Sequence, residues 1–126
     1  MNIKNTNIAS FPVTYKQLFT YWLVVTKLLH KLTDKEIDLL AILLYKRMEL
    51  SKDITNEKYL NKVLFDADTK KELEKELDVN NLRIQNILSS LRRKNVITDN
   101  RINPKFIPNI EHGAKNFRIV FNFEIK

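Results

Sequence analysis

The 126-residue chain has no cysteine, one glycine and three prolines. Without cysteine it can build neither a disulfide framework nor a thiolate zinc site, and it suits a reducing compartment inside a cell. The small amount of glycine and proline argues against a disordered or fibrous chain. With 44% hydrophobic residues, this length is enough for one core but not for two independent domains. We therefore expect one folded, helix-rich domain.

Long apolar runs and targeting signals are missing as well. The longest mainly apolar run, residues 18–29, is interrupted by Thr20, Thr26 and Lys27. It is shorter than the roughly 20 residues that cross a bilayer. The first residues do not have the pattern of a secretory signal. We expect a cytoplasmic protein without a membrane span, in a virion or host cytoplasm if it is encoded by a phage.

The motifs of catalysis and of metal binding are also absent from the sequence. His30 and His112 are the only histidines, and no cysteine accompanies them. The chain has no glycine-rich phosphate loop, no nucleophile elbow and no HExxH motif. Glutamates alternate with lysines in residues 70–76, which is typical of an exposed salt-bridge face. We expect neither enzymatic activity nor a cofactor or metal ion.

Positive charge is in excess and unevenly distributed. The chain has 22 basic and 15 acidic residues, a formal net charge of +7. Residues 31–78 hold ten basic and twelve acidic side chains, whereas residues 79–105 hold six basic side chains and one acidic side chain. A polyanionic partner for residues 79–105 follows from this distribution.

The N-terminal part is predicted to be a flexible arm at residues 1–12 and an additional helix within residues 13–31. Apolar residues at spacings of three and four predict a helix over 14–30, although the β-branched and aromatic run 21–25 leaves a strand as the alternative. The stripe consists of Leu18, Phe19, Trp22, Val25, Leu28, Leu29 and Leu32. It would either cover the domain core or pair with the same helix of a second subunit in a homodimer.

Further helices are predicted over 33–50, 56–65, 69–77 and 81–94. Thr33 and Glu36 have the spacing of a capping box, which marks a helix start. Residues 66–68 and 78–81 are rich in Asp and Asn, which cap helices and tolerate left-handed backbone angles. The last helix is expected to bury Ile84, Leu88 and Leu91, with Ile87 beside them.

The C-terminal part is predicted to contain two strands. Val96 and Ile97 favour a short strand, residues 98–115 a long loop, and residues 116–125 a second strand with period-two alternation. Its apolar positions are Phe117, Ile119, Phe121, Phe123 and Ile125. The expected fold class is therefore mainly α with a small β-wing (α+β).

Residues 69–97, TKKELEKELDVNNLRIQNILSSLRRKNVI, resemble the winged helix-turn-helix DNA-binding family of phage and bacterial regulators. Residues 32–43 resemble the first helix of such domains, and the resemblance extends to residue 125. The positions that match the family's buried pattern are Leu73, Leu77, Val79, Ile84, Leu88 and Leu91. The resemblance implies a winged helix-turn-helix domain at residues 32–126, preceded by an extra N-terminal helix.

The chain departs from the family pattern at three residues and in one loop. Asp78 and Asn95 stand where the family often has glycine, and both residue types can adopt a positive φ angle. Leu82 occupies an early recognition-helix position that is frequently polar, where it would serve a methyl contact, a protein contact or simple burial. The long loop between the predicted strands implies an elaborated wing.

The candidate recognition helix, about 81–94, carries polar side chains suited to nucleic acid. Arginine pairs with guanine, and asparagine or glutamine with adenine. The base-reading candidates are Asn81, Arg83, Gln85, Asn86 and Ser89. The phosphate-contact candidates are Lys70, Lys71, Arg92, Arg93, Lys94, Arg101, Lys105 and Lys115. Residues 92–94 alternatively do no more than complement the helix dipole.

The predicted function is sequence-specific or general binding of double-stranded DNA, in the regulation of transcription or replication. The alternative is a protein-protein interaction module in a virion or polymerase assembly, with Leu82 and Ile87 in the interface. An open and positive face at positions 83, 85, 86 and 89 favours DNA, whereas a covered one favours a protein partner. Abundant Asn, Ile and Lys fit a phage- or plasmid-like protein, although A+T-rich codons would enrich the same residues.

Overall fold

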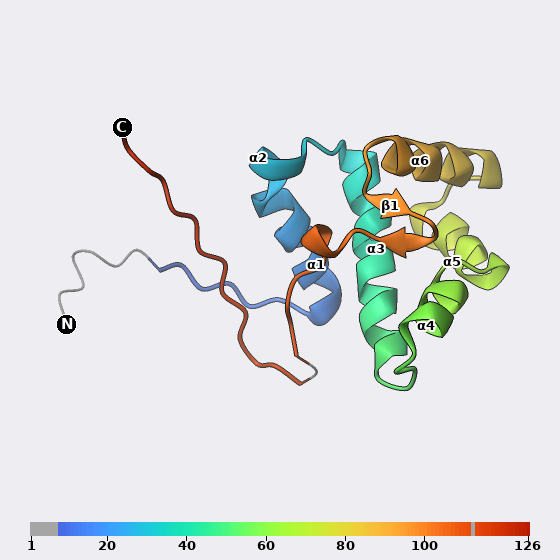
Figure 1. Cartoon of the computed structure of the whole chain (residues 1–126), viewed down its shortest axis with the longest axis horizontal. Helices are drawn as coiled ribbons and strands as arrows, with labels where there is room; N and C mark the ends of the chain where they lie inside the picture. The colour runs from blue at the N-terminus through green and yellow to red at the C-terminus, as the bar shows by residue number, and fades with distance from the viewer. Residues whose placement is uncertain (1–7, 112) are drawn as a thin grey trace.

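The computed structural model describes residues 8–111 and 113–126. The described chain is mainly helical with a two-stranded antiparallel sheet, which confirms the fold class at this level (Figure 1). The elements in chain order are α1 (Tyr15–Val25), α2 (Lys27–His30), α3 (Asp34–Ser51), α4 (Glu57–Leu64), α5 (Ala67–Leu77), α6 (Asn81–Arg93), β1 (Ile97–Thr98), β2 (Arg101–Ile102) and the 3-10 turn η2 (Pro104–Phe106). Residues 1–7 of the predicted arm and His112 of the predicted wing loop lie outside the described residues.

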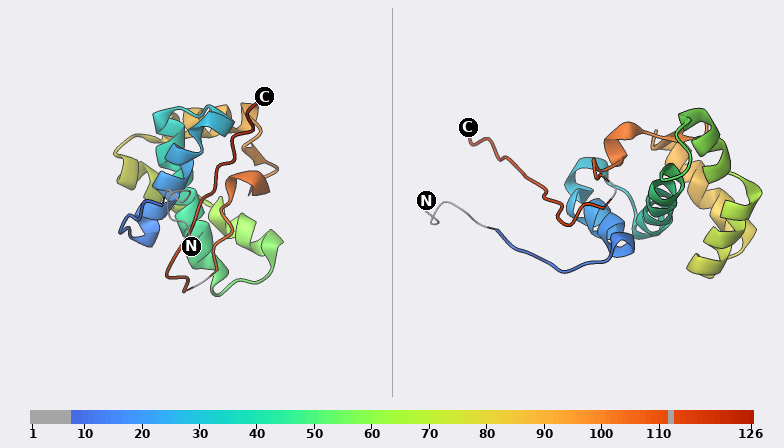
Figure 2. Two further views of the ribbon diagram at one scale, coloured as in Figure 1. Left: turned by 90° about the vertical axis from the view of Figure 1, so that its left-hand side faces the viewer. Right: turned by 90° about the horizontal axis from the view of Figure 1, so that it is seen from below.

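Helix α3 is the central element of the fold. Helix α1 packs on one side of it, and α4, α5 and α6 pack on the other (Figures 1 and 2). Leu39, Leu40 and Leu43 of α3 are fully buried among side chains of these neighbours. A helix covered on both sides has to be apolar over most of its circumference, and α3 satisfies this requirement.

Side-chain caps fix where the helices begin. The predicted capping box is confirmed: the Glu36 amide donates to the Thr33 hydroxyl at 3.2 Å, and the Thr33 amide donates to the Glu36 carboxylate at 2.8 Å. Asn56, Asp66 and Asn80 cap α4, α5 and α6 by accepting from the amide three residues later. Each cap stabilises its helix by about 1 kcal/mol. The predicted helices after residue 33 are therefore confirmed to within a few residues.

The predicted continuous helix over 14–30 is wrong at Thr26, where α1 ends and α2 begins. The Thr26 hydroxyl donates to the carbonyl of Trp22 at 2.6 Å, a back-bond that bends helices. The His30 Nε2 lies 2.7 Å from the Leu23 carbonyl oxygen and donates to it, while its Nδ1 accepts from the Leu32 amide. The strand alternative for residues 21–25 is also wrong.

The residues of this region that face the core differ from the predicted stripe. Leu23 and Thr26 are buried, although the predicted stripe left both out. Val25, Leu28 and Leu29, which the stripe included, have 42%, 79% and 75% of their surface exposed. Phe19, Leu23 and Thr26 keep helical spacing, so the predicted stripe had the wrong phase within α1 itself. Leu28 and Leu29 lie beyond the break, in α2.

The sheet is a tight hairpin, and the predicted long wing loop and second strand at 116–125 are both wrong. Ile97 pairs with Ile102 and Thr98 with Arg101, so only Asp99 and Asn100 form the turn. Their φ angles are 52° and 53°, as a type I′ turn requires at both central residues. The isoleucines are buried and the other pair is exposed. Residues 116–126 run extended but belong to no sheet in the described chain.

Asn100 should therefore respond to substitution differently from its strand neighbours. Asn100→Val is expected to lower the free energy of unfolding by roughly 1–2 kcal/mol, because a β-branched residue is strained at positive φ. Asn100→Gly is expected to keep or slightly raise stability. The matched control is Thr98→Val, which puts the same side chain into β1 and should be nearly neutral. Urea unfolding measures all three, and equal effects of the two valines would contradict the turn geometry.

Candidate nucleic-acid interface

Helices α5 and α6 are joined by a three-residue turn, Asp78 to Asn80. Asp78 adopts a left-handed conformation, with φ 53°, and ends α5. The Asn80 side chain accepts from the Arg83 amide at 2.9 Å and starts α6. Asn95 after α6 also has a positive φ, 60°. The two residues that replace the glycines of the family pattern thus have the backbone conformation expected of them.

Helix α6 has one buried and one open side. Ile84, Ile87, Leu88 and Leu91 are buried against the rest of the core. The opposite side carries all five predicted base-reading residues: Asn81, Arg83 and Asn86 are exposed, and Gln85 and Ser89 are partly exposed. These polar groups are therefore accessible along one helix.

Leu82 belongs to the open side of α6 and is 68% exposed, so simple burial is excluded as its role. Positions 82, 85, 86 and 89 follow the spacing that places side chains on one helical face. This face, Leu82 with Gln85, Asn86 and Ser89, is called the α6 stripe below. It combines hydrogen-bonding groups with one apolar side chain.

Glu36 of α3 holds the C-terminal end of α6 in place. Its carboxylate accepts from the Ser90 hydroxyl and from the Lys94 ammonium, both at 2.6 Å, in addition to the Thr33 amide. The Glu36 side chain is only 4% exposed. Burial raises the pKa of Glu36, but the hydrogen bonds from Lys94, Ser90 and Thr33 outweigh it and lower the pKa to about 2. Glu36 is therefore ionised at neutral pH and fixes the orientation of α6 on α3.

Some of the predicted phosphate-contact side chains already have a partner within the protein, and others do not. Lys94 is bound to Glu36, Arg101 lies 3.6 Å from Glu57, and the Lys105 ammonium lies 5.4 Å from the centre of the Phe106 ring. Within the described residues, Lys70, Lys71, Arg92 and Arg93 form no ion pair. These four cations are at the start of α5 and the end of α6.

Lys115 lies away from α6. The hydroxyl of Tyr15, at the start of α1, donates to the carbonyl of Ala114 next to it. Helix α1 is separated from α6 by α3 (Figure 1). Lys115 therefore does not belong to the same surface as the open side of α6.

No known protein family matches the chain. Comparisons with curated proteins and with solved structures gave no match either. In the described chain, no helix has both the length and the apolar composition that a membrane span needs. The same residues contain no group of three or more His, Asp or Glu placed to hold a metal ion. The interpretation of this site therefore depends on its own residues.

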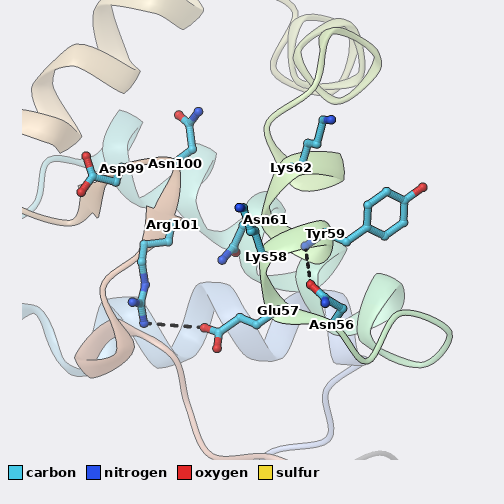
Figure 3. A pocket seen from close by; sticks show the side chains of 9 residues that line it. All are labelled: Asn56, Glu57, Lys58, Tyr59, Asn61, Lys62, Asp99, Asn100 and Arg101. Atoms are coloured by element: carbon cyan, nitrogen blue, oxygen red, sulfur yellow. Dashed lines mark hydrogen bonds and ion pairs between the residues drawn. The ribbon is translucent and has the colours of Figure 1, made fainter.

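A groove between α4 and the hairpin is lined by polar and charged residues, of which only Arg101 was among the predicted site residues. Lys58, Tyr59 and Lys62 of α4 line one side, and Asp99, Asn100 and Arg101 line the other (Figure 3). Arg101 reaches across it to Glu57, while Tyr59 points outward and is 57% exposed. The two lysines have the i, i+4 spacing of one helical face, but only the tertiary structure places that face beside the hairpin.

Proposed function

We propose that the chain binds double-stranded DNA as a winged helix-turn-helix protein, with α6 as the recognition helix and the β1–β2 hairpin as a short wing. The observation that carries the proposal is the open α6 stripe, next to arginines at both ends of the helix. Arg83, Arg92 and Arg93 have no acidic partner among the described residues. The bound protein would regulate transcription or replication.

The positions of these side chains indicate which would contact bases and which would contact phosphates. A major groove admits an α-helix, and Arg83, Gln85 and Asn86 carry the donors and acceptors that distinguish base pairs. Leu82 is suited to contact a thymine methyl group. Lys70, Lys71, Arg92 and Arg93 would contact phosphates, which fix position without reading sequence. Because Glu36 and the buried leucines hold α6 on the rest of the fold, the helix backbone itself needs little ordering on binding.

The second candidate function is a protein-protein interaction module. The exposed side chain of Leu82, 68% accessible at the start of α6, favours it, because an apolar residue in that position also suits a protein interface. A partner that covers the α6 stripe would exclude DNA from it.

The test is fluorescence anisotropy with duplex DNA at increasing salt concentration. Wild-type affinity is expected to fall steeply, because each neutralised phosphate contributes about −0.9 to the slope of log K against log salt. Arg92→Ala/Arg93→Ala should weaken binding to all sequences and reduce that slope by about 2. Arg83→Ala/Gln85→Ala should reduce the preference for duplexes that wild type selects from a random pool, by roughly 1–3 kcal/mol for each lost base contact.

Lys52→Ala is the control for charge. Lys52 is exposed, follows the C-terminal end of α3 and pairs with Glu49, whereas α6 is tied to the opposite end of α3 through Glu36. The variant should bind as wild type does. Absence of duplex binding at low salt by a folded protein would contradict the proposal and favour the protein-protein function.

A further inference from the structure

Residues 116–126 form an extended segment, called the C-terminal segment below, that projects from the helical body (Figures 1 and 2). Its start is held on α1, where the rings of Trp22 and Phe117 meet edge to face with centroids 6.0 Å apart. Beyond this contact, the segment's backbone makes no hydrogen bond to any other backbone group of the described chain. Both of its edges are therefore open for pairing, which natural proteins usually avoid in long strands.

The side chains of the C-terminal segment are those of a strand with one apolar face. Odd positions are Phe or Ile throughout, and even positions are mainly polar. Aromatic and β-branched residues favour strands, yet Phe123 and Ile125 are 76% and 96% exposed. The strands β1 and β2 have two residues each, so they are too short to pair with this segment along its length. A partner strand from elsewhere would satisfy its backbone and cover its apolar face.

We propose that the partner is the same segment of a second copy of this chain, paired antiparallel about a twofold axis at Phe121. In this register Arg118 lies opposite Glu124 of the second copy, and Asn116 lies opposite Lys126. On the other face, Phe121 lies opposite itself. The remaining apolar pairs are Phe117 with Ile125 and Ile119 with Phe123.

The charges select this register over its neighbours. Directly opposite side chains of opposite charge stabilise a sheet, and like charges destabilise it. Centring the pair on Asn122 would place Arg118 opposite Lys126, whereas centring it on Val120 would leave Arg118 opposite Asn122 and Ile125 opposite Lys115. A parallel pair in register would place every charge opposite itself. The register about Phe121 alone matches both Arg118–Glu124 pairs, and it keeps the Phe and Ile side chains on one face.

The resulting ribbon has its apolar face toward the helical body. Phe117 and Ile119 are partly buried, whereas the alternate residues Arg118 and Val120 are exposed. An isolated two-stranded ribbon is marginally stable, and cover from a helical layer is what stabilises it. The contact of Phe117 with Trp22 provides the beginning of such cover in each copy.

The first experiment is sedimentation velocity of the full chain over a range of concentrations, without DNA. Wild type is expected to dimerise. Arg118→Glu and Glu124→Arg each place like charges opposite one another at two symmetric sites, and each should raise the dissociation constant about tenfold or more. The charge swap Arg118→Glu/Glu124→Arg restores both pairs at unchanged net charge, and it should return the constant to within about threefold of wild type. The segment lies outside the core, so these variants should remain folded.

A monomeric wild type at about 100 μM, well above the micromolar dissociation constants of weak complexes, would overturn the proposal. So would a dimer that the charge reversals leave unchanged, which is the result expected if the N-terminal helix joins two copies. Failure of the charge swap to restore pairing would overturn the register.

A single cysteine tests the axis directly, because the chain has no thiol of its own. Phe121→Cys should form a disulfide-linked dimer on mild oxidation, since the two cysteines would face each other across the axis. Asn116→Cys is the matched control, because ten residues of strand, about 33 Å, would separate its thiols. Equal crosslinking of the two variants, or none with Phe121→Cys, would overturn the proposed pairing.

Discussion

Replacing Glu36 with alanine is expected to lower the free energy of unfolding by about 3 kcal/mol. The substitution removes a carboxylate that accepts hydrogen bonds from Thr33, Ser90 and Lys94 at 2.6–2.8 Å. It also leaves a gap in the interior, because the Glu36 side chain is only 4% exposed. Urea unfolding followed by circular dichroism measures the change. Asp34→Ala is the matched control, since its carboxylate is in the same helical turn but is 89% exposed, and it should change stability by less than about 0.5 kcal/mol.

The same carboxylate should make stability depend on pH. The pKa of Glu36 is about 2 in the folded protein against an ordinary value of 4.5. Because the folded value is the lower one, the contribution of Glu36 is complete above the ordinary value and is lost as the pH falls from about 5 to about 2. The loss is on the order of 3 kcal/mol. Glu36→Gln should remove this part of the pH dependence. Parallel curves of the free energy of unfolding against pH for wild type and variant would show that Glu36 is not its source.

Leu40→Ala is expected to destabilise the fold by roughly 2–5 kcal/mol. Leu40 of α3 has no exposed surface, and its truncation leaves a cavity between helices that can close only in part. Leu28→Ala is the matched control, because the same chemical change is made where the leucine is 79% exposed. Its effect should stay below about 0.5 kcal/mol. A large loss from Leu28→Ala would contradict the exposed position of Leu28 on α2.

The α6 stripe was largely predictable, because it depends on local rules. Once Asn80 starts a helix and Ile84, Leu88 and Leu91 define its buried side, helical periodicity fixes which residues face away. The site residues 81, 83, 85, 86 and 89 follow from that. The partners of Lys94 and Arg101 were not predictable in this way, because Glu36 and Glu57 are distant in sequence and reach them only through the packing of α3 and α4.

The sequence alone also determined the helix starts after residue 33 and the left-handed conformation of Asp78. Caps and positive φ angles arise from hydrogen bonds and steric effects within about four residues, so a short window of sequence contains their cause.

The tertiary structure decided the features that depend on distant contacts. It set which face of α1 is buried, the break at Thr26, the burial of Glu36 against α6 and the position of the second strand. The alternation in residues 116–125 is strong, yet Arg101–Ile102 forms that strand, because the Asp99–Asn100 turn brings Ile102 into the core directly opposite Ile97. A strand pattern indicates which face is apolar. The choice of the partner strand depends on which backbone the rest of the fold brings within hydrogen-bonding distance.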